Sequence, residues 1–185
     1  MHDTFRIDEA TGLLAAVRQV LSPHFDARPA GVAASLIVVH GISVPPAHFG
    51  GPWIDQLFTG NLSPHAHPGF ASIAALRVSA HVLIRRDGSV TQYVAFQMRA
   101  WHAGRSSFEG HEACNDYSVG IELEGTDELA YEDPQYRSLG SLIRALCATY
   151  PAMSSQRVVG HSDVAPGRKT DPGPAFDWPR LRQLL

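Results

Sequence analysis

Residues 35–40 read Ser-Leu-Ile-Val-Val-His, so four successive positions carry large apolar side chains. A strand at a solvated face alternates apolar and polar residues, whereas a strand that is apolar on both faces is covered on both sides by other parts of the fold. The stretch therefore predicts a central, buried strand and an α/β fold. His40 ends this strand, at the edge where open sheets place their ligands.

A hairpin and a long helix are also marked in the sequence. Asp87-Gly88 separates two strand-like runs, 78–86 and 89–94, which predicts an antiparallel pair joined by a tight turn. Asp133-Pro134 is typical of a helix start, and apolar residues at helical spacing follow as far as Tyr150. Further expected elements are helices over 9–21, 52–58 and 178–185 and a strand over 157–159. Because the runs 78–86 and 89–94 form a hairpin, the sheet is at least partly antiparallel.

Composition restricts the size and the partners of the fold. With 185 residues, 44% of them hydrophobic, the chain fits one domain, which we place over residues 1–185. The net charge of -3, with no basic run beyond Arg85-Arg86, argues against nucleic acid or an anionic membrane as partner. No run approaches the ~20 apolar residues of a membrane span, and the first residues lack the apolar stretch of a signal peptide. We therefore expect a cytoplasmic protein with a small-molecule substrate.

The segment 160–174 carries the side chains best suited to chemistry. Its three glycines and three prolines predict a loop without helix or central strand. His161 and one of two aspartates, Asp163 or Asp171, are possible zinc ligands, and a catalytic zinc site needs three ligands and an open position for water. His40 is the candidate for the third ligand, because it and His161 both follow a Val-Val pair at a strand end.

Three other side chains attract attention. Lys169 is the only lysine among 15 basic residues, and its compact charge suits one specific contact. Trp101 lies in a predicted loop and is either a core residue or the wall of a ligand site. His81, in the middle of a predicted strand, suits packing as well as function.

Residues 117–125 predict a strand with two glutamates on one face. Apolar side chains at 119, 121 and 123 alternate with Gly120, Glu122 and Glu124. The glutamates belong either to the solvated face of an antiparallel strand, which is the commoner case, or to a site. Gly120 beside them indicates that another group approaches the strand closely.

Several segments together resemble a known family. They are residues 38–43, 49–55, 77–81, 99–104, 120–125 and 161–174. In this combination the chain is similar, over nearly its whole length, to the zinc amidase family that includes phage amidase-type lysozymes and peptidoglycan recognition proteins. Within that family it resembles the cytoplasmic 1,6-anhydro-N-acetylmuramyl-L-alanine amidases. The resemblance implies an α/β (α+β) fold with a mixed central β-sheet flanked by helices.

The resemblance also implies a metal site. It makes His40, His161 and Asp171 the ligands of one zinc ion per chain, and so favours Asp171 over Asp163. Zinc with three protein ligands lowers the pKa of its water toward about 7 and polarises a carbonyl group. The implied reaction is hydrolysis of the amide between the lactyl group of muramic acid and L-alanine.

Catalytic and substrate-binding roles follow from the same resemblance. Glu122 would transfer the proton of the water to the leaving amine, and Lys169 would stabilise the negative charge on the carbonyl oxygen. We place Arg77, Trp101 and Asn115 at the substrate, with Arg77 binding a carboxylate of the peptide.

Two positions depart from the family pattern. Relatives carry asparagine after the first histidine and arginine before the Cys-Asn-Asp run, where this chain has Gly41 and Ala113. The missing arginine affects recognition of the diaminopimelate end of the stem peptide.

Three alternatives remain beside a recycling amidase that acts as a monomer on muropeptides. They are a module that binds murein fragments without cutting them, an amidase on intact peptidoglycan, and a structural zinc protein. A complete ligand set with Glu122 and Lys169 favours the enzyme over the binding module. The absence of a signal peptide argues against the second alternative, and an open metal position against the third.

Overall fold

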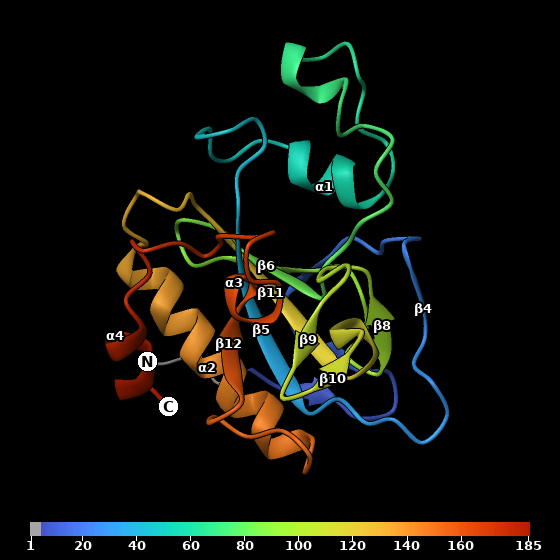
Figure 1. Ribbon diagram of the computed structural model, residues 1–185, viewed down its shortest axis with the longest axis vertical. Coiled ribbons are helices and arrows are strands. Elements are labelled where there is room, and N and C mark those ends of the chain that lie inside the picture. Colours follow the sequence, from blue (N-terminus) through green and yellow to red (C-terminus); the bar gives the residue numbers. More distant parts are fainter. Residues whose placement is uncertain (1–4) are drawn as a thin grey trace.

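The computed structural model describes residues 5–185, and a six-stranded mixed sheet forms its centre (Figure 1). The strand order is β12-β5-β11-β6-β7-β3. The strands are β3 (Arg18–Gln19), β5 (Leu36–Ile42), β6 (Val82–Ile84), β7 (Val90–Gln92), β11 (Ser118–Glu124) and β12 (Val158–Gly160). β12, β5, β11 and β6 run parallel, β7 is antiparallel to β6, and β3 is parallel to β7. The mixed α/β fold expected from the sequence is thus confirmed.

β5 and β11 form the middle of the sheet, as the apolar stretch at 35–40 predicted. All seven residues of β5 pair with β11 in one parallel register, which sets His40 opposite Glu122. Alternate side chains of β5 enter different clusters. Ile37 and Val39 belong to the main core, while Leu36 packs with the smaller cluster on the other face. This explains why the strand is apolar on both faces.

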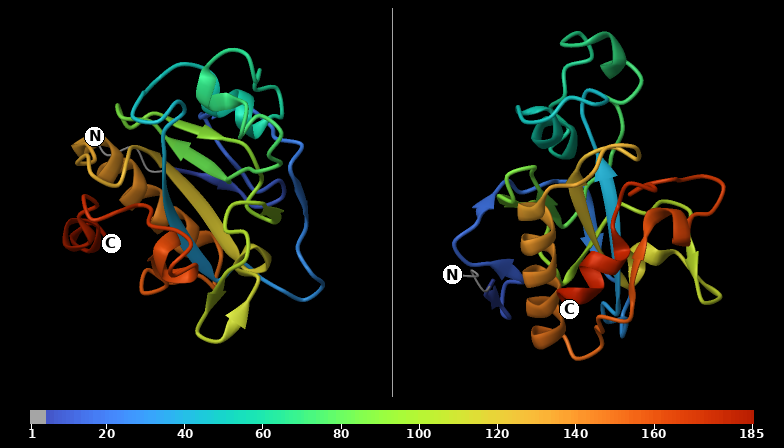
Figure 2. Two further views of the ribbon diagram at one scale, coloured as in Figure 1. Left: turned by 45° about the horizontal axis from the view of Figure 1, so that its top comes forward. Right: turned by 90° about the vertical axis from the view of Figure 1, so that its left-hand side faces the viewer.

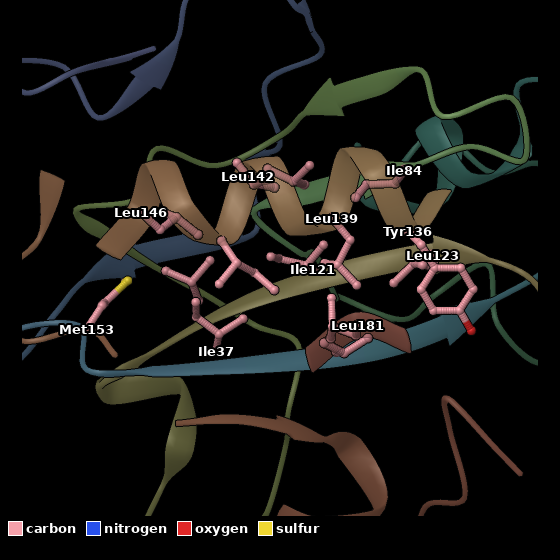
Figure 3. Packing of buried hydrophobic residues seen from close by; sticks show 14 of the residues in the cluster. Ile37, Ile84, Ile121, Leu123, Tyr136, Leu139, Leu142, Leu146, Met153 and Leu181 are labelled. Carbon is pink, nitrogen blue, oxygen red and sulfur yellow. The ribbon is translucent and has the colours of Figure 1, made fainter. Parts of the chain in front are cut away.

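α2 (Asp133–Thr149) covers one face of the sheet, with α4 (Trp178–Gln183) beside it (Figure 2). Leu139, Leu142 and Leu146 of α2 are fully buried and face Ile37 and Ile121 of the sheet (Figure 3). Burying each such side chain contributes about 1.5–3 kcal/mol. The N-cap is Glu132, the residue before the Asp133-Pro134 pair that predicted the helix start, and the Glu132 N–H donates to Gln135 Oε1 over 3.0 Å.

The segment that follows β5 projects beyond the carboxyl ends of the parallel strands (Figure 1). It contains α1 (Trp53–Phe58), where a helix was predicted, and a 3-10 turn, η1 (Pro68–Phe70). Ile54, Phe58 and Phe70 bury their side chains in a second cluster with Leu83 and Tyr93 of the sheet region. This packing fixes the projecting segment over one end of the sheet.

The expected helix over residues 9–21 is wrong. That stretch contains the end of a small hairpin, β1 (Ile7–Asp8) with β2 (Leu13–Leu14), followed by β3 at the sheet edge. Gly12 makes the turn with a φ of 68°, and the Leu14 N–H donates to Gln92 Oε1 over 2.7 Å. Long-range pairing therefore overrides the helical spacing of the apolar residues. A separate antiparallel pair is formed by β4 (Phe25–Ala27) and β8 (Met98–Ala100).

The expectation that residues 160–174 contain no helix is also wrong in part. α3 (His161–Val164) is a short helix that ends before Pro166. It contains no proline or glycine, so the residues that predicted a loop lie outside it. The remaining elements near it are β9 (Ser107–Phe108), β10 (His111–Glu112) and the 3-10 turn η2 (Cys114–Asp116). Asp87-Gly88 does join β6 to antiparallel β7, as predicted. Among residues 5–185 no helix is both long enough and apolar enough to cross a bilayer.

Candidate metal centre

His40, His161 and Asp171 meet at the carboxyl ends of β5 and β12. His40 Nδ1 lies 2.9 Å from His161 Nδ1 and 3.3 Å from Asp171 Oδ2, and His161 Nδ1 lies 3.0 Å from the same oxygen. Donors about 2.0–2.2 Å from a tetrahedral zinc are about 3.3–3.6 Å apart. The distances between the three atoms would therefore increase by roughly half an ångström to hold zinc. Two imidazoles and a carboxylate are a donor set that suits zinc.

The sheet register brings the two histidines together. Gly160, the last residue of β12, pairs with Val39, so the residues that follow both strands lie side by side. His161 then starts α3, and the Gly160 N–H donates to Asp163 Oδ2 over 2.7 Å. Asp163 thus braces the turn and is outside the donor cluster, whereas Asp171 is inside it.

The environment sets the charge of the donors. Burial lowers the pKa of His40 to about 4, although Asp171 opposes the shift, so the imidazole is neutral at pH 7. A metal ligand must be a neutral imidazole or an ionised carboxylate. Burial would raise the pKa of Asp171, but hydrogen bonds to His161 and His40 outweigh it and hold that pKa below its usual range.

Glu122 lies opposite His40 on the neighbouring strand β11 and is buried. Burial raises the pKa of its carboxyl group well above the usual value, the negative charge of Asp171 adds to the rise, and Lys169 opposes it. Among the described residues, Glu122 Oε2 has no hydrogen-bond partner. A buried carboxyl oxygen without a protein partner calls for a partner from outside the chain, such as a water or a ligand.

Glu124 shares the face of Glu122 but is engaged within the protein. Its Oε1 accepts from the Gly50 N–H over 2.7 Å and from Arg85 Nη1 over 2.9 Å, and its side chain is 2% exposed. The alternative that the two glutamates form a solvated face is therefore wrong. β11 has parallel neighbours on both sides, and Gly50 in the segment after β5 contacts Glu124 directly.

The predicted substrate-binding residues lie in two settings. Arg77 is exposed and its guanidinium lies 5.4 Å from the centre of the Trp101 ring, which is half-buried and stacked on His24. Trp101 Nε1 is buried without a hydrogen-bond partner among residues 5–185. Asn115 is buried, and its Oδ1 accepts from the backbone N–H groups of His102 and Ala103. Lys169 is exposed in the turn that leads to Asp171.

His102 was not singled out by the sequence, yet it contacts a donor residue directly. Its Nδ1 lies 2.9 Å from His40 Nε2, and its Nε2 lies 3.1 Å from Ser118 Oγ. The ring lies against Gly120, where a Cβ would come within 2.6 Å of His102 Nδ1. The glycine in the strand did indicate a close approach, but no local signal identified the partner. His81 is a packed polar group that accepts from the Gly120 N–H.

The two departures from the family pattern have different surroundings. A Cβ at Gly41 would collide with the hydroxyl group of Tyr131, which donates to the Pro172 carbonyl over 3.0 Å. Ala113 is exposed, with a φ of 55°, at a cavity of about 460 Å³ that Arg105 and Arg168 also line. The space next to Ala113 is therefore open and borders two arginines.

Comparison with known proteins supplies independent information. The profile of the N-acetylmuramoyl-L-alanine amidase family matches residues 30–174. The 1,6-anhydro-N-acetylmuramyl-L-alanine amidase AmpD of Salmonella typhimurium (strain SL1344) is 62% identical over 174 residues, which cover 94% of this chain and 92% of that protein.

Solved structures agree with this match. A crystal structure of a selenomethionine derivative of AmpD has a TM-score of 0.93 to this chain at 60% identity and covers 97% of it and 98% of that protein. AmpDh3 from Pseudomonas aeruginosa, solved in complex with anhydromuramic pentapeptide, has a TM-score of 0.63 at 29% identity. That alignment covers 82% of this chain and 59% of AmpDh3. The resemblance seen in the sequence is confirmed.

Proposed function

This chain belongs to the N-acetylmuramoyl-L-alanine amidase family, and from that premise we propose that it cleaves muropeptides with the help of bound zinc. The bond broken is the amide between the lactyl group of 1,6-anhydro-N-acetylmuramic acid and L-alanine. The observation that carries the proposal is the cluster of His40, His161 and Asp171 next to Glu122, whose buried Oε2 has no partner among residues 5–185.

Each of the chain's own groups has a chemical task in this reaction. Zinc, when bound, supplies a Lewis acid that polarises the amide carbonyl and lowers the pKa of water. Glu122 accepts the proton of the attacking water at its carboxylate and delivers it to the nitrogen of L-alanine as the C–N bond breaks. Burial raises the pKa of Glu122, and a raised pKa favours a carboxyl group that both takes and returns a proton.

Lys169 and the substrate surface complete the assignment. The ammonium of Lys169 is close enough to lower the pKa of Glu122, and at that position it can stabilise negative charge on the carbonyl oxygen. Arg77 presents an exposed guanidinium beside the Trp101 ring, which suits a peptide with a free carboxylate. Asn115 completes the expected substrate-binding residues, although its Oδ1 already accepts two backbone hydrogen bonds.

The finer parts of the proposal rest on the relatives. The similar Salmonella protein is named for the 1,6-anhydro sugar, and AmpDh3 was solved with an anhydromuramic peptide. These names support a role in peptidoglycan recycling. We add to the proposal one amidase domain over residues 1–185 and one zinc ion per chain, because one donor cluster is found among the described residues. Monomeric state and cytoplasmic location belong to the same proposal.

One experiment tests the chemistry. Purified protein is freed of metal with a chelator, reloaded with zinc, and given anhydro-muropeptides, reducing muropeptides and intact peptidoglycan, with products read by mass spectrometry. We expect zinc-dependent release of the free peptide, fastest from the anhydro form. Binding of the muropeptide without any cleavage would replace the proposal with the binding-module alternative, and preference for intact peptidoglycan would replace the recycling role.

A variant pair assigns the proton transfer. Glu122→Gln keeps the shape of the side chain and should retain about one zinc per chain while kcat falls by about a hundredfold or more. Glu124→Gln, on the same face of β11, is the matched control, and its kcat should fall far less at a temperature where both variants are folded. Equal losses in the two variants would remove the proton-transfer role from Glu122.

A further inference from the structure

We propose that His102 is a positioning residue that fixes the ring of His40 so that Nδ1 faces the metal. The proposal rests on the proposed zinc site. His102 touches His40 from the side opposite the donor cluster, because it contacts Nε2 while Nδ1 faces His161 and Asp171. His102 is accordingly outside the group of residues that offer donors to one ion.

The hydrogen bonds provide a partner for every proton that a zinc-binding His40 requires. A neutral His40 that offers Nδ1 to a metal carries its proton on Nε2 and donates it to His102 Nδ1, 2.9 Å away. His102 then carries its own proton on Nε2 and donates it to Ser118 Oγ, 3.1 Å away. The chain of contacts from Ser118 through His102 therefore accommodates the tautomer of His40 that binds zinc, because His102 Nδ1 can accept the proton on His40 Nε2.

The position of the His102 ring is itself held from several sides. Gly120 leaves room for the ring, which lies against its Cα, and the rings of His102 and His40 are almost perpendicular at 87°. The His102 N–H and the Ala103 N–H both donate to Asn115 Oδ1, over 3.2 and 2.8 Å. A ring fixed in this way can orient a neighbour, which a mobile surface side chain cannot.

The same loop also reaches the second histidine ligand. The Ala103 carbonyl lies 3.2 Å from His161 Nε2, on the side of that ring away from Asp171. Outer hydrogen bonds of this kind orient metal-binding imidazoles, and their loss typically lowers metal affinity about 10–100-fold. The outer partner of His161 is a backbone carbonyl, whereas the outer partner of His40 is the side chain of His102, which mutation can remove.

The test compares three variants by zinc affinity. His102→Leu removes the hydrogen bond to His40, whereas His102→Asn keeps a polar atom at the position of Nδ1, since both atoms are bonded to Cγ. His24→Leu is the matched control: His24 is a buried histidine with one bond to a backbone carbonyl, Val78 O at 3.0 Å, and it does not touch a donor residue. Zinc dissociation constants come from competition with a chromophoric chelator, and the absorption bands of the cobalt-loaded proteins report coordination geometry.

We expect His102→Leu to weaken zinc binding about 10–100-fold and to change the cobalt spectrum. His102→Asn should restore most of the affinity, and His24→Leu should leave the affinity unchanged although it lowers the melting temperature. Unchanged affinity in His102→Leu overturns the proposal, and so does an equal loss in His24→Leu, which would indicate general loosening. If the unmodified protein binds no zinc, the proposed function fails and the role of His102 fails with it.

A fourth variant, Ser118→Ala, covers the case in which His102→Leu does not fold. Ser118→Ala removes only the outer partner of His102 and leaves the ring in place. Its zinc affinity should fall measurably, by less than in His102→Leu, while its circular dichroism stays unchanged. Unaltered zinc affinity and an unaltered cobalt spectrum in Ser118→Ala would contradict the chain of hydrogen bonds and overturn the proposal.

Discussion

Gly120→Ala would place one methyl group against the ring of His102. A Cβ in ideal geometry on the strand backbone lies 2.6 Å from both Cδ2 and Nδ1 of the ring. Carbon atoms in favourable contact are about 3.5–4.0 Å apart, so the ring must retreat by about 1 Å. The strand cannot give way instead, because β11 is hydrogen-bonded to β5 on one side and to β6 on the other.

A retreat of about 1 Å has two consequences of different kinds. Overpacking of this type costs about 1–3 kcal/mol of stability, which for a chain of this size lowers the melting temperature by about 2–12 °C. Hydrogen bonds weaken outside about 2.7–3.2 Å, so the 2.9 Å contact between His102 and His40 would be lost or distorted. We therefore expect weaker zinc binding as well as lower stability.

The double variant Gly120→Ala/His102→Ala separates the two consequences. Removing the ring makes room for the methyl group, so the stability loss due to crowding should disappear, with a coupling free energy of about 1–3 kcal/mol. Zinc affinity should stay as low as in His102→Ala alone. Thermal unfolding of the metal-free proteins and chelator competition measure the two quantities. Additive stability losses, or wild-type zinc affinity in Gly120→Ala, would refute the steric argument.

Three further predictions concern the site and its surroundings. Asp171→Ala should lose zinc and activity together, whereas Asp163→Ala should keep about one zinc per chain; metal analysis showing the reverse would exchange their roles. Glu124→Leu should lower the free energy of unfolding by about 1–3 kcal/mol, because the Gly50 N–H and Arg85 Nη1 lose their acceptor while Asp55 still pairs with Arg85, and denaturant titration measures this. Ala113→Arg should raise kcat/KM about tenfold for a three-residue stem peptide over a one-residue stem, as one charge-assisted contact would. Steady-state kinetics that show a strong preference for the longer stem in the unmodified protein would contradict this last prediction.

Local sequence predicted those parts of the fold whose signals are local. The apolar run at 36–39, three of whose four residues are β-branched, favours a buried strand, and the turn at Asp87-Gly88 has a backbone requirement that glycine meets, with a φ of 83°. The error at residues 9–21 has the opposite cause. There the apolar spacing suits a helix, but pairing of Arg18 and Gln19 with a strand more than seventy residues away stabilises an extended chain.

The candidate site was predictable to the extent that its residues end strands. His40 and His161 were found because each follows a Val-Val pair, while the choice between Asp163 and Asp171 needed the resemblance. Spacing along the chain does not say which aspartate faces inward, since Asp163 lies in a four-residue helix and Asp171 in the turn after it, and neither element has a clear local signal. His102 was missed for a related reason. It lies in a loop without periodicity, and its partner His40 is 62 residues away in the sequence.

The parallel pairing of β5 with β11 and β12 has a consequence for how the protein is made. The two histidines of the donor cluster are 121 residues apart, so they meet only after long-range strand pairing, which is the slow part of folding. In the proposed zinc enzyme the ion would therefore bind only a nearly finished fold and would not nucleate it. Metal that binds the native state alone stabilises it by mass action, by about 4 kcal/mol at a free concentration a thousand times the dissociation constant. For the enzyme proposed above, zinc starvation would thus shorten the lifetime against unfolding and proteolysis in addition to stopping turnover.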